Sequence, residues 1–203
     1  RSPSRGLGDV YKRQEVTPEL IKEEKPDSVI IATGSKTLIL PIEGIDNPAI
    51  IHGSDLLDGK RAAGKKVLVV GGGMVGCETA AFLGEQEHDV TVIEFRDTVG
   101  ADVIHEHRVY LMKDFEDYGI KEITGAKVCK FYEDGVEYET ADGVRHESRG
   151  YDSVILSMGF RNYNPLEEKI KDLVPETHVI GDAIRARRAL DATKEAYEVA
   201  SRL

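Results

Sequence analysis

Short runs of mostly apolar residues mark the strands of this chain. The runs VIIA, VLVV, VTVI and VIL fall within residues 28–32, 67–70, 89–93 and 153–156. Runs this short, bounded by glycine or polar residues, are typical of strands that are buried on both faces. Because such strands belong to parallel sheets covered by helices, the pattern predicts an α/β protein.

Helical segments alternate with these strands. We expect helices over about residues 17–24, 74–85 and 104–118, and a last helix that follows HVIGDA and continues to the C-terminus. The order strand, glycine turn, helix and strand over residues 67–94 is one βαβ unit. Three further strand candidates, KVCKFYE, GVEYET and VRHESR, are separated by Asp-Gly turns and predict a small β-meander.

The run VLVVGGGMVGCETA predicts a phosphate-binding loop of the Rossmann type. A Gly-x-Gly-x-x-Gly string is informative here because it follows an apolar strand and begins a helix. Gly71 permits the tight turn, Gly73 lets backbone N–H groups approach a pyrophosphate, and Gly76 lets the helix pack closely on the strand. The partial positive charge of the helix N-terminus favours the phosphates.

An acidic residue, Glu94, ends the second strand of this unit. At that position a carboxylate accepts hydrogen bonds from the adenosine ribose hydroxyls and repels a 2′-phosphate, which favours NAD(H). Arg96 would instead attract the 2′-phosphate of NADP(H), so NADP(H) stays as the alternative. The alternative without a binding role is that Glu94 is a solvated acid at a strand end.

The composition limits the other classes of function. A net charge of −10 without a basic stripe disfavours nucleic acid and anionic lipid as partners, and no apolar run is long enough to span a bilayer. The only cysteines, Cys77 and Cys129, provide neither a disulfide framework nor a zinc site, which fits a cytoplasmic protein. Cys77 is better explained by packing than by reactivity. The sequence supports no catalytic residue and no metal ligand.

The order of the motifs resembles the flavoprotein reductases with two dinucleotide-binding domains. IIATGS, VVGGGMVGCETA, VTVIE, SVILSMG and HVIGDA follow one another as in that superfamily. The glycine loop and the ending VIGDAIRARRALDATKEAYEVA most resemble the C-terminal half of NADH:flavin oxidoreductases of the 2,4-dienoyl-CoA reductase and enoate reductase type. The resemblance implies that NADH passes a hydride to FAD, and that the intact protein reduces an activated C=C bond.

The resemblance also implies how the chain is divided. Residues 15–62 would be the remnant of a first FAD-domain segment plus a linker, residues 63–160 an inserted NAD(H)-binding Rossmann domain, and residues 161–203 the returning FAD segment. Asp182 would then bind the ribityl chain of FAD, although an Asp at this point also suits a helix N-cap over residues 183–189. The candidate cofactor-binding residues are Ala32, Thr33, Gly34, Gly71, Gly72, Gly73, Met74, Val75, Gly76, Glu94, Arg96, Gly159, Gly181, Asp182 and Ala183.

Two departures from this family suggest a fragment: the first FAD glycine motif is not seen, and neither are the flavin barrel and its cluster cysteines. Residues 1–14 end in DVYKRQ, which resembles a translated sequencing adapter, so we expect them to be non-native, with a polar disordered tail as the alternative. The first FAD glycine motif, expected before Glu15, is not seen. The implied N-terminal flavin barrel, with FMN, an iron-sulfur cluster and the substrate contacts, would be the missing partner of this chain.

Two other functions share the same motifs. A pyridine nucleotide-disulfide reductase has this two-lobe plan but needs a redox cysteine pair in its FAD lobe. A nucleotide-binding or electron-relay module would hold a dinucleotide without turnover, because a Rossmann loop alone does not specify a reaction.

Overall fold

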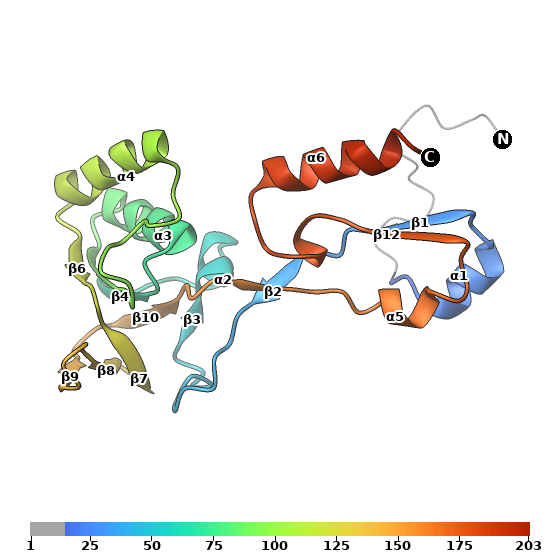
Figure 1. The fold of residues 1–203 in the computed structure, drawn as a ribbon. Coiled ribbons are helices and arrows are strands. Elements are labelled where there is room, and N and C mark those ends of the chain that lie inside the picture. The colour runs from blue at the N-terminus through green and yellow to red at the C-terminus, as the bar shows by residue number, and fades with distance from the viewer. Residues whose placement is uncertain (1–14) are drawn as a thin grey trace. The chain divides into compact units, whose positions relative to one another are not determined.

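The computed structural model describes residues 15–203, which form two compact units (Figure 1). The larger unit comprises residues 37–160, and the smaller comprises residues 15–36 together with 161–203. The expectation that residues 1–14 are non-native lies outside the described residues. The connector after Lys36, which the sequence analysis treats as a linker within residues 15–62, lies with the larger unit.

A five-stranded sheet with all of its pairings parallel forms the centre of the larger unit, with the order β3, β10, β4, β5, β6. Its strands are β3 (Ile51–His52), β4 (Lys66–Val70), β5 (Asp89–Ile93), β6 (Lys121–Ile123) and β10 (Ser153–Leu156). Because the strands run the same way, their carboxyl ends lie at one edge, where ligands bind in open α/β sheets.

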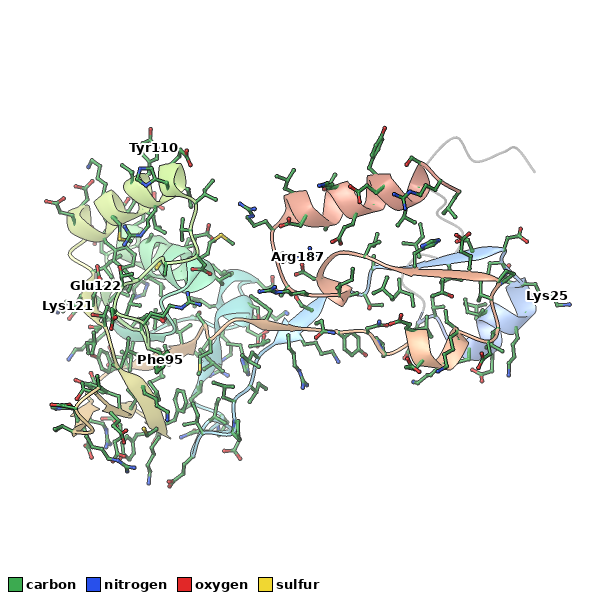
Figure 2. All side chains as sticks on the ribbon, in the orientation of Figure 1. Lys25, Phe95, Tyr110, Lys121, Glu122 and Arg187 are labelled. Carbon is green, nitrogen blue, oxygen red and sulfur yellow. The ribbon has the colours of Figure 1, made fainter. Side chains whose placement is uncertain are left out.

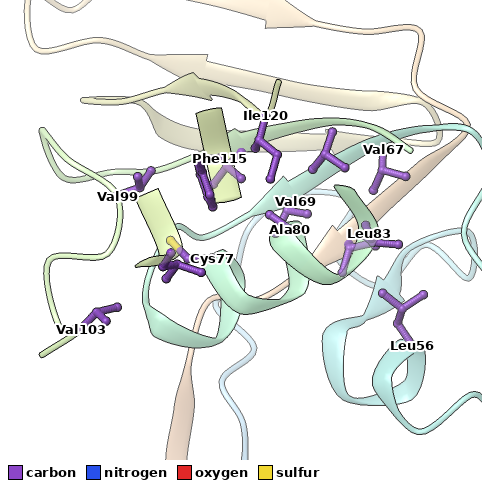
Figure 3. Packing of buried hydrophobic residues seen from close by; sticks show 14 of the residues in the cluster. Leu56, Val67, Val69, Cys77, Ala80, Leu83, Val99, Val103, Phe115 and Ile120 are labelled. Atoms are coloured by element: carbon purple, nitrogen blue, oxygen red, sulfur yellow. The ribbon is translucent and has the colours of Figure 1, made fainter. Parts of the chain in front are cut away.

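Side chains of the central strands alternate between two apolar clusters. Val67 and Val69 of β4 pack with helices α2 (Gly53–Leu57), α3 (Met74–Glu85) and α4 (His105–Asp117), as Figure 3 shows. Leu68 and Val70 belong to a second cluster with the meander. The central strands are therefore covered on both faces, which explains why β4, β5 and β10 appear in the sequence as mostly apolar runs.

The meander consists of β7 (Lys127–Tyr132), β8 (Gly135–Glu139) and β9 (Arg145–Ser148), paired antiparallel. Phe131 and Val136 are buried and join Leu68 in the second cluster. The predicted Asp134-Gly135 turn closes the first hairpin, and Tyr151 N–H donates to the Asp134 carbonyl at 3.0 Å. The three strand candidates of the sequence are thus confirmed as a small sheet.

The smaller unit is built on one parallel pair, β1 (Ser28–Ile31) with β12 (Glu176–Val179). Helix α1 (Pro18–Glu24) has Thr17 as its N-cap, whose hydroxyl accepts a hydrogen bond from the N–H of Leu20. The remaining elements are α5 (Glu167–Ile170), the 3₁₀ turn η2 (Gly181–Ala183) and α6 (Ala189–Ala200). Ile21, Ile31 and Ile170 contribute to its apolar cluster.

A last strand pair, β2 (Ser35–Thr37) with β11 (Phe160–Asn162), contains the two points at which the chain passes between the units. The sequence did not predict this pair, because each strand has only three residues and no apolar alternation. None of the helices formed by residues 15–203 is long and apolar enough to cross a membrane.

Candidate functional site

The predicted phosphate loop connects the end of β4 to the start of α3. Gly71 has a φ of 104°, and a Cβ atom there would lie 2.4 Å from the carbonyl oxygen of Ser157. A Cβ on Gly76 would lie 1.8 Å from the carbonyl oxygen of Gly71. Both contacts are with backbone, so only glycine fits these two positions. The loop therefore turns as tightly as the sequence predicted.

The N-terminus of α3 opens at the same edge of the sheet. Gly73 is the N-cap and offers no side chain, so the first N–H groups of the helix need other acceptors. The N–H of Met74 donates to Oδ1 of Asp102 at 3.0 Å. Val75 lies in the first turn and its carbonyl accepts the Thr79 hydroxyl at 2.7 Å. A helix terminus of this kind favours an anion.

Glu94 follows β5 directly and lies against the phosphate loop. Its Oε2 accepts a hydrogen bond from the N–H of Gly72 at 2.6 Å, and its Oε1 accepts one from the N–H of Arg96 at 2.9 Å. The residue is only 9% exposed. The two backbone bonds fix the carboxylate, and each oxygen keeps a further lone pair for a ligand hydroxyl. Glu94 is therefore a buried acid with two backbone hydrogen bonds and not a solvated one.

The two residues after Glu94, Phe95 and Arg96, both have exposed side chains. Phe95 is 69% exposed (Figure 2), and the Arg96 side chain is exposed as well. The backbone of Arg96 is held in place, because its carbonyl accepts the N–H of Gly125 at 2.9 Å. Only the backbone of Arg96, and not its guanidinium, is thus fixed beside the carboxylate of Glu94.

The end of β10 completes this edge of the sheet. The N–H of Ser157 donates to the Val70 carbonyl at 2.8 Å, which brings the segment 157–159 beside the phosphate loop. Gly159 has a φ of 99°, and its carbonyl accepts the N–H of Leu38 at 2.9 Å. The predicted site residues of the larger unit thus follow β4, β5 and β10 at their carboxyl ends.

Cys77 lies in the first turns of α3 and is fully buried. Burial raises the pKa of its thiol to about 12, so the thiol is neutral at physiological pH. Its Sγ contacts the carbonyl oxygen of Gly72 at 3.2 Å, and the side chain belongs to the apolar cluster beneath α3 (Figure 3). The packing role predicted for Cys77 is confirmed.

The predicted FAD residues meet at one edge of the smaller unit. Residues 32–34 follow β1, and residues 181–183 follow its parallel neighbour β12. Ser35 Oγ donates to Oδ2 of Asp182 at 3.1 Å. The hydroxyl of Thr33 donates to the carbonyl of Tyr163 at 2.5 Å. Parallel pairing of two strands far apart in sequence therefore gathers these residues.

Asp182 does not cap a helix over residues 183–189, and that alternative is wrong. Gly181–Ala183 is a single 3₁₀ turn, and α6 begins only at Ala189. Oδ1 of Asp182 accepts the N–H of Arg187 at 3.0 Å. The carboxylate of Glu195 accepts the N–H of Gly181 at 2.7 Å and pairs with the guanidinium of Arg187, whose hydrogen bond lowers the pKa of Glu195.

Two residues at these sites were missed by the sequence reasoning. Asp102, in the loop after β5, accepts a hydrogen bond from the N–H of Met74 at the start of α3. Ser35, the first residue of β2, donates its hydroxyl to the carboxylate of Asp182, which follows β12. Asp102 belongs to no local motif, and Ser35 ends the run IIATGS but no spacing in the sequence signals it as a partner of Asp182. Within residues 15–203, no cluster of three or more His, Cys, Asp or Glu side chains is arranged to hold a metal ion.

Comparison with known proteins finds oxidoreductases that are similar in sequence to most of this chain. The bilirubin reductase of Mediterraneibacter gnavus is 33% identical over 186 residues, which are 90% of this chain and 28% of that protein. The NADH oxidase of Thermoanaerobacter brockii is 33% identical over 90% of this chain and 29% of its own length. The cinnamate reductase of Clostridium sporogenes is 30% identical over 91% of this chain and 28% of its length. The chain thus spans less than a third of these relatives.

A solved structure shares the fold. The 2-naphthoyl-CoA reductase in complex with 2-naphthoyl-CoA superimposes with a TM-score of 0.85 at 30% identity, over 93% of this chain and 29% of that one. The α/β dinucleotide-binding fold and the resemblance to enoate reductase-type proteins, both predicted from the sequence, are confirmed. The family model described as pyridine nucleotide-disulphide oxidoreductase matches residues 6–183. This chain belongs to the pyridine nucleotide-disulphide oxidoreductase family.

Proposed function

We propose that this chain binds NAD(H) in its larger unit and FAD in its smaller unit, as part of a flavin-dependent NADH oxidoreductase. The observation that carries the proposal is the position of Glu94. Its carboxylate follows β5 and is fixed by the N–H of Gly72 inside the phosphate loop. A single site thus combines a glycine loop, a helix N-terminus and a ribose acceptor, which are the three parts of a dinucleotide site.

The residues present fit NAD(H) on chemical grounds. Gly71 and Gly76 keep the loop free of side chains where a Cβ would collide with backbone, so a pyrophosphate can approach the N–H groups of the loop. Glu94 would accept the adenosine ribose hydroxyls and oppose a 2′-phosphate. The exposed Arg96 keeps NADP(H) as the alternative ligand. No acid or base is required of this chain, because the cofactors supply the hydride chemistry when bound.

The smaller unit fits FAD by a similar argument. Asp182 and Ser35 form a hydrogen-bonding pair beside the glycine turns at Gly34 and Gly181, both of which have positive φ. Asp182 would accept ribityl hydroxyls, and Thr33 and Gly34 would line the flavin or its pyrophosphate. The contribution of this chain would be to orient the ring and to exclude water.

The reaction of the longer protein is part of the same proposal. Cinnamate and 2-naphthoyl-CoA, named for a relative and a structural neighbour, both carry unsaturation conjugated with a carbonyl group. We propose reduction of an activated C=C bond, with FMN and an iron-sulfur cluster held outside this chain. This chain does not fit such a cluster, because Cys77 and Cys129 are its only cysteines and Cys77 is buried.

Bleaching of added flavin by NADH tests the proposal. Under anaerobic conditions with saturating FAD, the chain should accelerate the loss of the oxidised-flavin absorbance over FAD and NADH alone. The Asp182→Ala variant should need at least about tenfold more FAD, since hydrogen bonds to a charged group contribute about 1.5–3 kcal/mol.

Two results would contradict this account. A chain that binds both cofactors without accelerating bleaching would be a nucleotide-binding module, not an enzyme domain. Flavin retention that is unchanged in the Asp182→Ala variant would place FAD elsewhere.

A further inference from the structure

A loop after β5 crosses the phosphate loop and is firmly attached. The N–H of Gly100 donates to the Gly72 carbonyl at 2.7 Å, and the side chain of Val99 is completely buried. From α4, Arg108 donates to the carbonyl of Val99 at 3.1 Å and to the hydroxyl of Thr98 at 3.0 Å. The loop therefore has a defined path over the start of α3.

This loop places the carboxylate of Asp102 at the N-terminus of α3. Its Oδ1 accepts the N–H of Met74 at 3.0 Å, and its Oδ2 lies 3.2 Å from the position that a Cβ on Gly73 would take. Because the N-cap Gly73 has no side chain, Asp102 supplies an acceptor that the helix otherwise lacks. An exposed carboxylate thus caps α3 from outside the helix.

A pyrophosphate and this carboxylate compete for the same place. In a Rossmann site the phosphates bind the N–H groups at the start of this helix. The N–H of Met74 cannot serve both anions fully, and two anions at one helix terminus repel each other. Binding of a dinucleotide therefore requires Asp102 to leave, or to remain beside the phosphates at an electrostatic cost.

We propose that Asp102 is an internal competitor of the pyrophosphate, which caps α3 in the free protein and is displaced when a dinucleotide binds. This inference rests on the proposed NAD(H) site. The carboxylates of Glu94 and Asp102, both near the phosphate loop, would then affect dinucleotide binding in different ways. Glu94, at the ribose position, sets the preference between NADH and NADPH, whereas Asp102, at the pyrophosphate position, lowers the affinity for both alike.

The test is a calorimetric titration of the full chain with NADH and with NADPH, for the wild type and Asp102→Asn. Asparagine keeps the shape and an oxygen acceptor for Met74 but removes the charge. We expect the variant to bind both dinucleotides about 3- to 10-fold more tightly at low salt, as a charge at a helix terminus implies. The gain should shrink as salt is added, a response that a purely structural role would not give.

Asp97→Asn is the matched control, because it removes the same charge from the same loop at an exposed residue whose carboxylate lies beside Gly125, and it should leave the affinity unchanged. Unchanged or weaker binding by a folded Asp102→Asn variant would overturn the inference while leaving the NAD(H) site intact. If that variant fails to fold, Asp102→Ser, which also removes the charge and keeps an oxygen, decides in the same way. Absence of binding in all of these folded chains would contradict the proposed function itself.

Discussion

The Gly76→Ala variant is expected to be strongly destabilised and to bind NADH poorly. The new Cβ would lie 1.8 Å from the carbonyl oxygen of Gly71, and neither backbone can move without displacing α3 from β4. Overpacking of this kind destabilises by about 3 kcal/mol. A displaced helix also misplaces its N-terminal N–H groups, so we expect at least about a tenfold loss of NADH affinity, equivalent to about 1.4 kcal/mol. Urea unfolding and NADH titration measure the two effects.

Gly84→Ala is the control for this substitution, because it lies on the same helix. Its Cβ would lie 2.8 Å from the Cβ of Tyr118 and 3.2 Å from Cδ1 of Ile120, so the helix must shift there too, but by less than the 1.8 Å contact at Gly76 requires. Gly84→Ala should therefore cost less stability and leave NADH binding almost unchanged. Equal stability and equal affinity in both variants would show that the close packing at Gly76 is unimportant.

Replacement of Glu94 is expected to have the second large effect. Glu94→Ala removes the ribose acceptor and leaves the N–H groups of Gly72 and Arg96 without their present partner. Because hydrogen bonds to a charged group contribute about 1.5–3 kcal/mol, NADH affinity should fall about 10- to 100-fold. NADPH affinity should fall less, since the same change removes a repulsive charge. The ratio of the two dissociation constants, measured by titration, is the readout.

Glu122→Ala provides the matched control for the loss of a carboxylate. Glu122 is exposed on β6, the strand next to β5 in the sheet (Figure 2). Its removal should leave both dissociation constants unchanged. If Glu94→Ala and Glu122→Ala behave alike, Glu94 is only a strand-end acid and the assignment of NAD(H) fails.

Much of the fold was predictable because its central elements carry their own signals. The strands β4 (KVLVV) and β5 (DVTVI) are mostly apolar, and the helix predicted over residues 74–85 is α3 (Met74–Glu85). The strands β3 and β6 were not predicted, because short strands are defined by the neighbour they pair with and not by their own residues. The position of the connector after Lys36 depends on tertiary packing for the same reason.

The candidate site, like the fold, was predictable from the sequence only in part. The tight fit of Gly71 and Gly76 was predictable, since a glycine motif records where backbone must pass closely. The contact between Gly71 and Ser157 arises from the pairing of β10 with β4, which joins distant parts of the sequence. The role of Asp102 depends on the path of an irregular loop. Residues of a local motif could therefore be predicted from the sequence, but contacts between residues that are far apart in the sequence could not.

Calorimetric titration of the wild-type chain with NADH and, separately, NADPH tests the central claim most directly. The account predicts saturable binding of NADH at a single site in the larger unit, tighter than the binding of NADPH. A chain that is shown to be folded by circular dichroism but binds neither dinucleotide would contradict it, because the glycine loop would then be only a turn.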